Sequence, residues 1–295
     1  MKRRISDASR SDSREARARR PPSFGVIVPA LDEADVITAT VQRLRDSASV
    51  VDVVVADGGS TDGTVDAARR AGARVVVAPA GRGAQMNRGA AHVRGDTLLF
   101  LHADCRLPSN AFELMVDVLH TGRDAGLFAV DYEGSSRLLR LVSRLSHLRT
   151  RWTEFGEGAL FVRRARFERL GGFPEWPLFE DVALLARLRA AGTLGRARGR
   201  VTASPRRYLR RGVLRQLLLN ATLYGLFHLG VSPRRLHDWY EGGERRRVPA
   251  GARDGRRPGA RARNSLHPAG GTRYRARCLE SPLRPPGSAR RRDAP

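Results

Sequence analysis

Two kinds of hydrophobic pattern alternate along the chain. Short runs of β-branched and other apolar residues are typical of buried strands, and they occupy 24–28, 50–56, 75–77 and 98–101. The segments between them place apolar residues three or four positions apart, as on one face of a helix. Those faces comprise Val36, Ile37, Thr40, Val41 and Leu44 in one segment and Phe112, Met115, Val116 and Leu119 in another. This alternation predicts an α/β fold with a mostly parallel central sheet flanked by helices.

The two ends of the chain lack this patterning and hold most of its positive charge. The 295 residues include 54 Lys or Arg against 30 Asp or Glu, a formal net charge of +24. Residues 1–20 contain eight basic and three acidic residues, and 243–295 contain fifteen and four. We expect disordered basic tails over 1–22 and 242–295 and a single domain over 23–241. The second tail is either a surface for anionic partners such as RNA or an incidental extension from a shifted reading frame.

Several classes of protein are disfavoured. No run of eighteen apolar residues is present to span a membrane, and the short apolar stretch at 24–28 makes a poor signal peptide. The two cysteines, Cys105 and Cys278, provide neither a disulfide framework nor a four-ligand zinc site. A cytoplasmic location is therefore the simplest expectation.

Polar and glycine-rich segments follow the first two predicted strands, where ligands of parallel sheets bind. Pro29 ends the first strand, and Asp32 next to Glu33 is either a helix cap or part of a ligand loop. Asp57 ends the second strand and precedes two glycines, which allow a tight turn and the close approach of a ligand. Its carboxylate could accept hydrogen bonds from a base or a ribose, although an ordinary turn also explains these residues.

Two later segments carry groups suited to phosphate and to a cation. Arg82 lies between two glycines before a helix, which suits a phosphate or a nucleotide, and a solvated loop arginine is the alternative. His102 and Asp104 follow the strand at 98–101, and on an extended segment their side chains would point the same way. Asp104 could hold Mg²⁺ or Mn²⁺ together with substrate phosphates, or it could simply cap a helix.

An acid pair, Glu180 and Asp181, opens a segment with apolar residues at Val182, Leu185 and Leu188. Acids at a helix N-terminus complement the helix dipole, and that alone explains their presence. The preceding loop holds two glycines and two prolines and is the kind of segment that presents a catalytic base.

In this order and spacing, these segments resemble the family 2 glycosyltransferases of the GT-A type over about Phe24 to Tyr240. The marks are Asp57-Gly58-Gly59-Ser60-Thr61-Asp62-Gly63-Thr64, Gly81-Arg82-Gly83 with Gln85-Met86-Asn87, Phe100-Leu101-His102-Ala103-Asp104, and Gly171-Gly172-Phe173 leading to Glu180-Asp181. Within the family, the chain is most similar to a bacterial subgroup of selenodomain-associated and arsenosugar-associated transferases. The resemblance implies a GT-A fold with a Rossmann-like nucleotide-binding half.

The resemblance also implies a role for each matching residue. Asp181 would be the general base, with Glu180 beside it, and Asp104 would be the metal-binding acid of the D-x-D motif. The donor-binding residues would be Pro29, Leu31, Glu33, Asp57, Gly58 and Arg82. The implied reaction moves a sugar from a nucleotide-sugar donor to an unknown acceptor by direct displacement with inversion. The donor is expected to be a UDP-sugar.

One departure from the family changes the expected chemistry. His102 stands where the family has the first acid of D-x-D, so Mg²⁺ or Mn²⁺ would have one carboxylate fewer. The family's downstream Q-x-x-R-W motif is not evident either. Arg206 and Arg207 are therefore candidates for neutralising the donor diphosphate.

Other classes remain as alternatives. A nucleotidyltransferase would need a lysine-bearing phosphate loop, and Lys2 is the only lysine. A nucleic-acid-binding protein would need basic residues on a folded face, whereas the excess lies in the tails, so no specific nucleic acid is expected. The apolar segment Gly212–Gly230, flanked by arginines, is either an ordinary core helix or an interfacial helix in peripheral contact with the anionic inner face of a membrane.

Overall fold

The computed structural model describes residues 21–133, 137–145 and 158–245. The tails expected at 1–22 and 242–295 fall almost wholly outside these ranges, and the domain bounds stay predictions. Contacts between Cα atoms divide the chain into one compact unit up to Leu218 and a second unit from Leu219 onward. The division lies inside helix α10 (Val213–His228).

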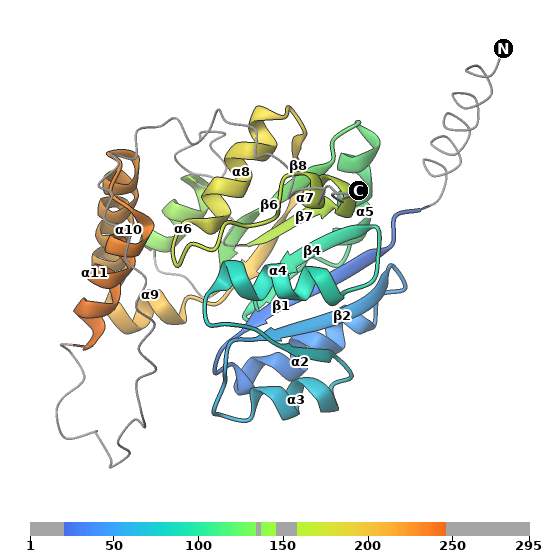
Figure 1. The fold of residues 1–295 in the computed structure, drawn as a ribbon, viewed down its shortest axis with the longest axis horizontal. Helices are drawn as coiled ribbons and strands as arrows, with labels where there is room; N and C mark the ends of the chain where they lie inside the picture. Colours follow the sequence, from blue (N-terminus) through green and yellow to red (C-terminus); the bar gives the residue numbers. More distant parts are fainter. Residues whose placement is uncertain (1–20, 134–136, 146–157, 246–295) are drawn as a thin grey trace, which may run out of the picture. The chain divides into compact units, whose positions relative to one another are not determined.

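The first unit is built on one sheet (Figure 1). Its described strands are β1 (Phe24–Ala30), β2 (Val50–Asp57), β3 (Arg74–Val77), β4 (Thr97–Leu101), β5 (Cys105–Arg106), β6 (Ala125–Tyr132), β7 (Ala159–Arg163) and β8 (Leu194–Ala203). They lie in the order β3-β2-β1-β4-β7-β6-β8-β5. Among them, four neighbouring pairs run parallel and three antiparallel, which confirms a mostly parallel sheet. The antiparallel strand β7 separates β4 from β6 and makes the sheet a mixed one.

Helices cover both faces of this sheet. One core includes residues of α2 (Ala34–Arg45), α3 (Thr64–Arg70) and α5 (Ala111–His120). The other includes residues of α4 (Arg82–His92), α7 (Arg164–Arg169) and α8 (Glu180–Ala190). The remaining described helices are α6 (Arg137–Leu145), α9 (Arg206–Arg211), α10 and α11 (Pro233–Arg245).

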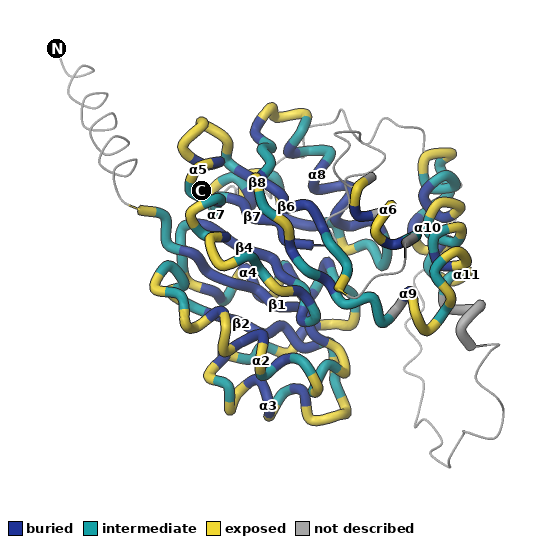
Figure 2. Tube along the Cα trace, turned by 180° about the vertical axis from the view of Figure 1, so that it is seen from behind, coloured by how far each residue is buried: buried dark blue, intermediate teal, exposed yellow. Residues whose placement is uncertain are grey.

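Strand β1 shows how the sequence builds both cores. All seven of its residues are buried, and Phe24, Val26 and Val28 enter one core while Ile27 enters the other. This follows from the strand period of two, because successive side chains point to opposite faces. Each such side chain stabilises the fold by about 1.5–3 kcal/mol when fully buried. Figure 2 shows the central strands in dark blue, with exposed residues along the outer sides of α2 and α3.

The predicted helical faces are confirmed in one case and partly wrong in the other. In α2, Ile37, Thr40, Val41 and Leu44 are the buried residues, as expected. In α5, Met115 and Leu119 are buried with Ala111 and Val118, whereas Phe112 and Val116 are only partly buried. The buried face of α5 is therefore rotated toward Ala111 and Val118.

The topology brings the ends of β1, β2 and β4 to one edge of the sheet. Strand β1 pairs in parallel with β2 on one side and with β4 on the other. The loops that leave these strands carry Glu33, Asp57 and Asp104. None of the described helices is long and apolar enough to cross a membrane.

Candidate active site

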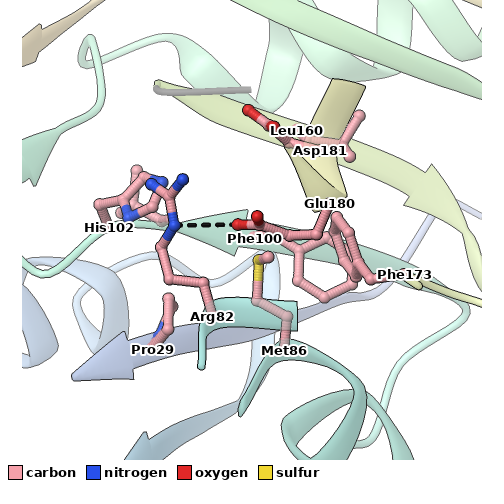
Figure 3. Close-up of a pocket in the computed structure, with 10 residues that line it drawn as sticks. Pro29, Arg82, Met86, Phe100, His102, Leu160, Phe173, Glu180 and Asp181 are labelled. Carbon is pink, nitrogen blue, oxygen red and sulfur yellow. Dashed lines mark ion pairs between the residues drawn. The ribbon is translucent and has the colours of Figure 1, made fainter. Parts of the chain in front are cut away.

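A small pocket opens where β1 and β4 end and where α4 and α8 begin (Figure 3). Its volume is about 10 Å³, which is room for about one water molecule. It is lined by Pro29, Arg82, Met86, Phe100, Leu101, His102, Leu160, Phe173, Glu180 and Asp181. The fold thus brings together five of the residues that sequence analysis singled out, from four separate segments: Pro29, Arg82, His102, Glu180 and Asp181.

Glu180 and Arg82 form an ion pair inside this pocket. Arg82 Nε lies 2.9 Å from Glu180 Oε1, and the Glu180 side chain is 1% exposed against 35% for Arg82. Neither carboxylate oxygen accepts a well-aligned hydrogen bond from the described residues. Figure 3 shows the Glu180 side chain directed at Arg82, with the Asp181 side chain directed away from that pair. Arg82 is therefore the positive charge that opposes the burial of Glu180.

Burial dominates the protonation of Glu180. Loss of water around the carboxylate raises its pKa above the ordinary value of 4.5, and the neighbouring Asp181 raises it further. The positive charge of Arg82 opposes both effects without cancelling them. Because the folded state holds the proton more tightly than the unfolded state, Glu180 stabilises the fold most below pH 4.5. This contribution is lost as the pH rises through the raised pKa.

We expect Glu180→Gln to change how stability depends on pH. The amide keeps the shape of the side chain but never ionises, so the cost of a buried charge disappears above pH 4.5. The melting temperature of the variant should exceed that of the unsubstituted protein by about 2–4 °C at pH 8, which corresponds to about 1 kcal/mol in a domain of this size. The difference should vanish at pH 4. Thermal unfolding across pH 4–8 measures it.

The matched control for this substitution is Glu113→Gln, on the exposed side of α5. It should leave the pH profile of the melting temperature unchanged. Parallel profiles for Glu180→Gln and the unsubstituted protein would show that the buried carboxylate does not control stability.

Asp181 follows Glu180 in the first turn of α8 and is 8% exposed. The amide of Val182 donates a hydrogen bond to its Oδ1 over 2.8 Å. Phe179 precedes the acid pair in the left-handed region at φ 65°, which costs free energy in a non-glycine residue. This turn directs two successive acids from the start of one helix toward the pocket.

Hydrogen bonds tie the loop after β1 to the loop after β2. The amides of Asp32, Glu33 and Ala34 donate to side-chain oxygens of Ser60, Thr64 and Asp62, and the Thr61 amide donates back to Asp32 Oδ1. The hydroxyl of Thr64 is the main cause of a lowered Asp62 pKa. Asp32 is thus not the cap of α2: the cap position is Glu33, and the donors there are satisfied by residues of the second loop.

Asp57 holds the loop after β2 through hydrogen bonds to its carboxylate. Its carboxylate accepts hydrogen bonds from the Gly59 amide at 2.9 Å and from the Ser60 amide and hydroxyl. The residue is 2% exposed. Gln85 lies under the same corner, because its side-chain amide donates to the carbonyls of Ala30 and Ala56 at 2.8 and 2.9 Å. A Cβ on Gly58 would come 2.9 Å from Gln85 Nε2, so a larger residue there would displace the Gln85 amide from these two carbonyls.

Two other segments singled out in the sequence meet in the structure. Asn87 of α4 donates to the Phe173 carbonyl over 2.9 Å, and the Phe173 amide donates back to Asn87 Oδ1 over 3.0 Å. A Cβ on Gly172 would lie 2.7 Å from Asn87 Oδ1, and its φ of 69° also favours glycine. The Gly-Gly-Phe loop is therefore fixed against α4, and it carries Phe173 to the pocket.

The segment after β4 differs from the expectation. Strand β4 ends at Leu101, and the Cys105 amide donates to the His102 carbonyl, so residues 102–105 form a turn. The assumption that His102 and Asp104 share one side of an extended strand is therefore wrong. His102 lines the pocket, whereas Asp104 lies 4.0 Å from Nη2 of Arg206 and does not line it.

This arrangement fits a divalent cation poorly. Mg²⁺ and Mn²⁺ prefer several oxygen ligands, and within the described residues no three His, Cys, Asp or Glu side chains gather as a metal-binding group. Asp104 has a guanidinium beside it instead. Arg206 also donates to Glu33 Oε2 over 2.9 Å. The two residues expected to bind the metal therefore lie apart, with His102 in the pocket and Asp104 outside it. The Asp104 carboxylate is paired with Arg206.

Two further residues expected to bind the donor, Leu31 and Arg207, are not placed in the pocket by the structure. Leu31 is 51% exposed and does not line the pocket. The side chain of Arg207 lies outside the described part of the structure. Sequence reasoning assigned no role to Phe100, Leu160 or Arg164. The Arg164 guanidinium holds the end of α4 by donating to the carbonyls of Ala90, Val93 and Gly95. No local sequence signal marks Arg164, because its three acceptors lie about seventy residues away.

Comparison with known proteins shows which family this unit resembles. Residues 25–169 match the family model described as Glycosyl transferase family 2. The matched segment is slightly less than half of the 295 residues, and over it the chain is similar to this family. The match covers the loops after β1, β2 and β4, and it ends before the acid pair at the start of α8.

Two curated relatives are about a third identical to this chain over the aligned residues. The succinoglycan biosynthesis protein ExoA of Rhizobium meliloti (strain 1021) is 34% identical over 192 residues, covering 57% of this chain and 58% of the relative. Glycosyltransferase AglJ of Haloferax volcanii is 34% identical over 106 residues, covering 35% of each. The chain thus spans about half the length or less of these relatives.

Among solved structures, the chain is similar to glucosyl-3-phosphoglycerate synthase from Mycobacterium tuberculosis in complex with phosphoglyceric acid. The identity is 24% and the TM-score 0.49, covering 64% of this chain and 72% of that one. A second structure of that synthase, with Mn²⁺, UDP and glucosyl-3-phosphoglycerate, gives 24% identity and a TM-score of 0.48, with the same coverage.

Proposed function

We propose that the protein is a glycosyltransferase that moves a sugar from a nucleotide-sugar donor to an acceptor. One observation carries the proposal: Arg82, from the segment that matches glycosyltransferase family 2, meets Glu180 and Asp181 in one pocket beside the ends of β1 and β4. A cation and two carboxylates there suit a reaction in which a phosphate leaves and a hydroxyl loses a proton.

The donor would lie across the two tied loops and over the mouth of the pocket. A pocket of about 10 Å³ is far smaller than a sugar, so only the reacting groups reach into it. In this proposal, the base and ribose lie against Pro29, Leu31, Asp57 and Gly58. The diphosphate lies between Arg82 and the arginines of α9. The acceptor approaches the side of Asp181, which takes its proton as the new bond forms.

Direct displacement with inversion follows from the presence of a base and the lack of an assigned covalent nucleophile. A UDP-linked donor and membership of the selenodomain-associated or arsenosugar-associated subgroup rest on the sequence resemblance. A divalent cation would supply positive charge to the leaving diphosphate, and His102 with Asp104 would have to hold it. Because His102 lines the pocket and Asp104 lies outside it, these two residues fit one metal ion poorly.

The proposal is tested by thermal unfolding in the presence of UDP, GDP, ADP and their common sugar conjugates. A ligand that binds only the folded state raises the melting temperature by an amount that grows with its concentration over Kd. We expect one nucleotide series to raise it by several degrees at millimolar concentration. If none of them does so, with or without Mn²⁺, the protein is not a nucleotide-sugar transferase.

A nucleotidyltransferase remains the alternative enzyme, and nucleoside triphosphates in the same screen would reveal it. Peripheral contact of a cytoplasmic protein with an anionic membrane is also proposed. It is supported by the exposed Leu209, Leu214 and Leu218 beside Arg210 and Arg215 on α9 and α10. Sedimentation with vesicles of phosphatidylglycerol, compared with vesicles of phosphatidylcholine, decides this point.

A further inference from the structure

Arg206 lies between two carboxylates that come from the ends of different strands. Its Nη2 is 2.9 Å from Oε2 of Glu33, which follows β1, and 4.0 Å from Oδ2 of Asp104, which follows β4. Glu33 and Arg206 are 173 residues apart in the sequence. The three side chains are 27%, 30% and 39% exposed for Glu33, Asp104 and Arg206, so the cluster faces solvent at the edge where the donor would bind.

Backbone and ring contacts hold the start of α9 next to the turn that carries Asp104. Ala203 of β8 pairs with Cys105 of β5, and the Ser204 amide donates to the Asp104 carbonyl over 3.3 Å. Tyr208, two residues after Arg206, is 7% exposed, and its ring lies 5.1 Å from that of Tyr132. The start of α9 is thus tied to the turn that carries Asp104. The guanidinium itself is held by its ion pair with Glu33.

A cation fixed beside Asp104 occupies the place that a metal ion would need. A divalent ion bound by Asp104 would meet the like charge of Arg206 only a few ångströms away. Within the described residues, no group of three His, Cys, Asp or Glu side chains is present to hold such an ion against this repulsion. The guanidinium has five N–H donors in a planar fork, and most of them remain for an anion after the bond to Glu33.

We propose that Arg206 supplies the positive charge for the donor diphosphate, so that this protein binds nucleoside diphosphates without a divalent cation. The inference rests on the proposed function and concerns the same site. Arg82 is less suited to the task, because its charge compensates the buried Glu180. The two carboxylates beside Arg206 are partly exposed, so water also solvates their charges. Arg206 is therefore better able than Arg82 to bind phosphate oxygens.

The test is isothermal titration of the full chain with UDP, GDP and ADP, each beside the nucleoside that lacks its phosphates. Each titration is done in EDTA and in Mn²⁺. We expect the best diphosphate to bind the unsubstituted protein equally well, within about twofold, under both conditions. Arg206→Ala should weaken its binding in EDTA by about 10- to 100-fold, the range of a hydrogen bond to a charged group. The corresponding nucleoside should bind as before, and Arg206→Lys should restore part of the affinity.

Arg69→Ala is the matched control, because Arg69 also pairs with an acid, Asp66, but on the outer helix α3. It should leave every affinity unchanged. Diphosphate binding that requires Mn²⁺ in the unsubstituted protein would overturn the inference while supporting the proposed function. An equal loss of nucleoside and diphosphate affinity in Arg206→Ala would show a structural role alone and would also overturn it. If no nucleotide binds under any condition, both proposals fail.

Discussion

Replacing Asp181 with Asn should reduce sugar transfer by about 10²–10⁴-fold, which is the usual contribution of a general base. The amide has nearly the same shape as the carboxylate, and it can still accept the hydrogen bond from the Val182 amide. It cannot take a proton from the acceptor. Release of nucleoside diphosphate from the nucleotide sugar identified by thermal unfolding measures this loss, with water as the acceptor if no other is known.

Binding and folding should survive this substitution. The diphosphate should bind Asp181→Asn within about twofold of the unsubstituted protein, because the donor is expected on the side of Arg82 and Arg206. Asp117→Asn, on the exposed side of α5, controls for the loss of an acid elsewhere and should keep full turnover. If Asp181→Asn turns over at the normal rate, the base is another group, and Glu180 becomes the first candidate.

The second large effect is expected on donor affinity. Asp57→Asn should weaken nucleotide binding by about 10- to 100-fold, because a charge-assisted hydrogen bond to the base or ribose would be lost. Titration with the tightest-binding nucleoside measures the effect, since a nucleoside reports on the base pocket and not on the diphosphate.

The structure suggests a sharp control for Asp57. Its carboxylate also holds the loop through Ser60, so a loss of affinity could arise from the loop alone. Ser60→Ala removes the hydroxyl contacts to Asp57 and to the Asp32 amide while leaving the carboxylate in place. We expect Ser60→Ala to weaken binding by only about 2- to 5-fold, since one or two neutral hydrogen bonds are lost. Equal effects from the two substitutions would make Asp57 a loop-forming residue only.

The parts of the fold that sequence predicted are those with strong local patterns. Strands β1, β2 and β4 consist almost entirely of apolar residues because both of their faces are covered, and such runs are easily recognised. Strands β5, β6, β7 and β8 were not predicted. In β8, arginine alternates with glycine or alanine, and its place in the sheet is fixed by β6 on one side and β5 on the other. The conformation of β8 is therefore decided by pairing with strands distant in the sequence and not by the strand propensity of its own residues.

The candidate site was predictable in the same uneven way. Arg82, Glu180 and Asp181 lie where sequence placed them, at the starts of helices that follow sheet strands or glycine-rich loops. The predicted geometry of His102 and Asp104 was wrong because a turn begins directly after Leu101. Side chains two positions apart point the same way only within a strand. The neighbours of Arg206 could not be read from the sequence, because α9 reaches Asp104 only through the pairing of β5 with β8.

The hydrogen bonds between the first two loops have a consequence for attempts to redesign base preference. Each loop satisfies backbone amides of the other, so neither keeps its conformation when its partner is exchanged. A segment spanning residues 58–64 grafted from a relative would leave the amides of Asp32, Glu33 and Ala34 without acceptors, unless the graft carries matching hydroxyls and an acid. In the proposed donor site, the two segments therefore act as one unit, and we expect a change of base preference to require that both be replaced together.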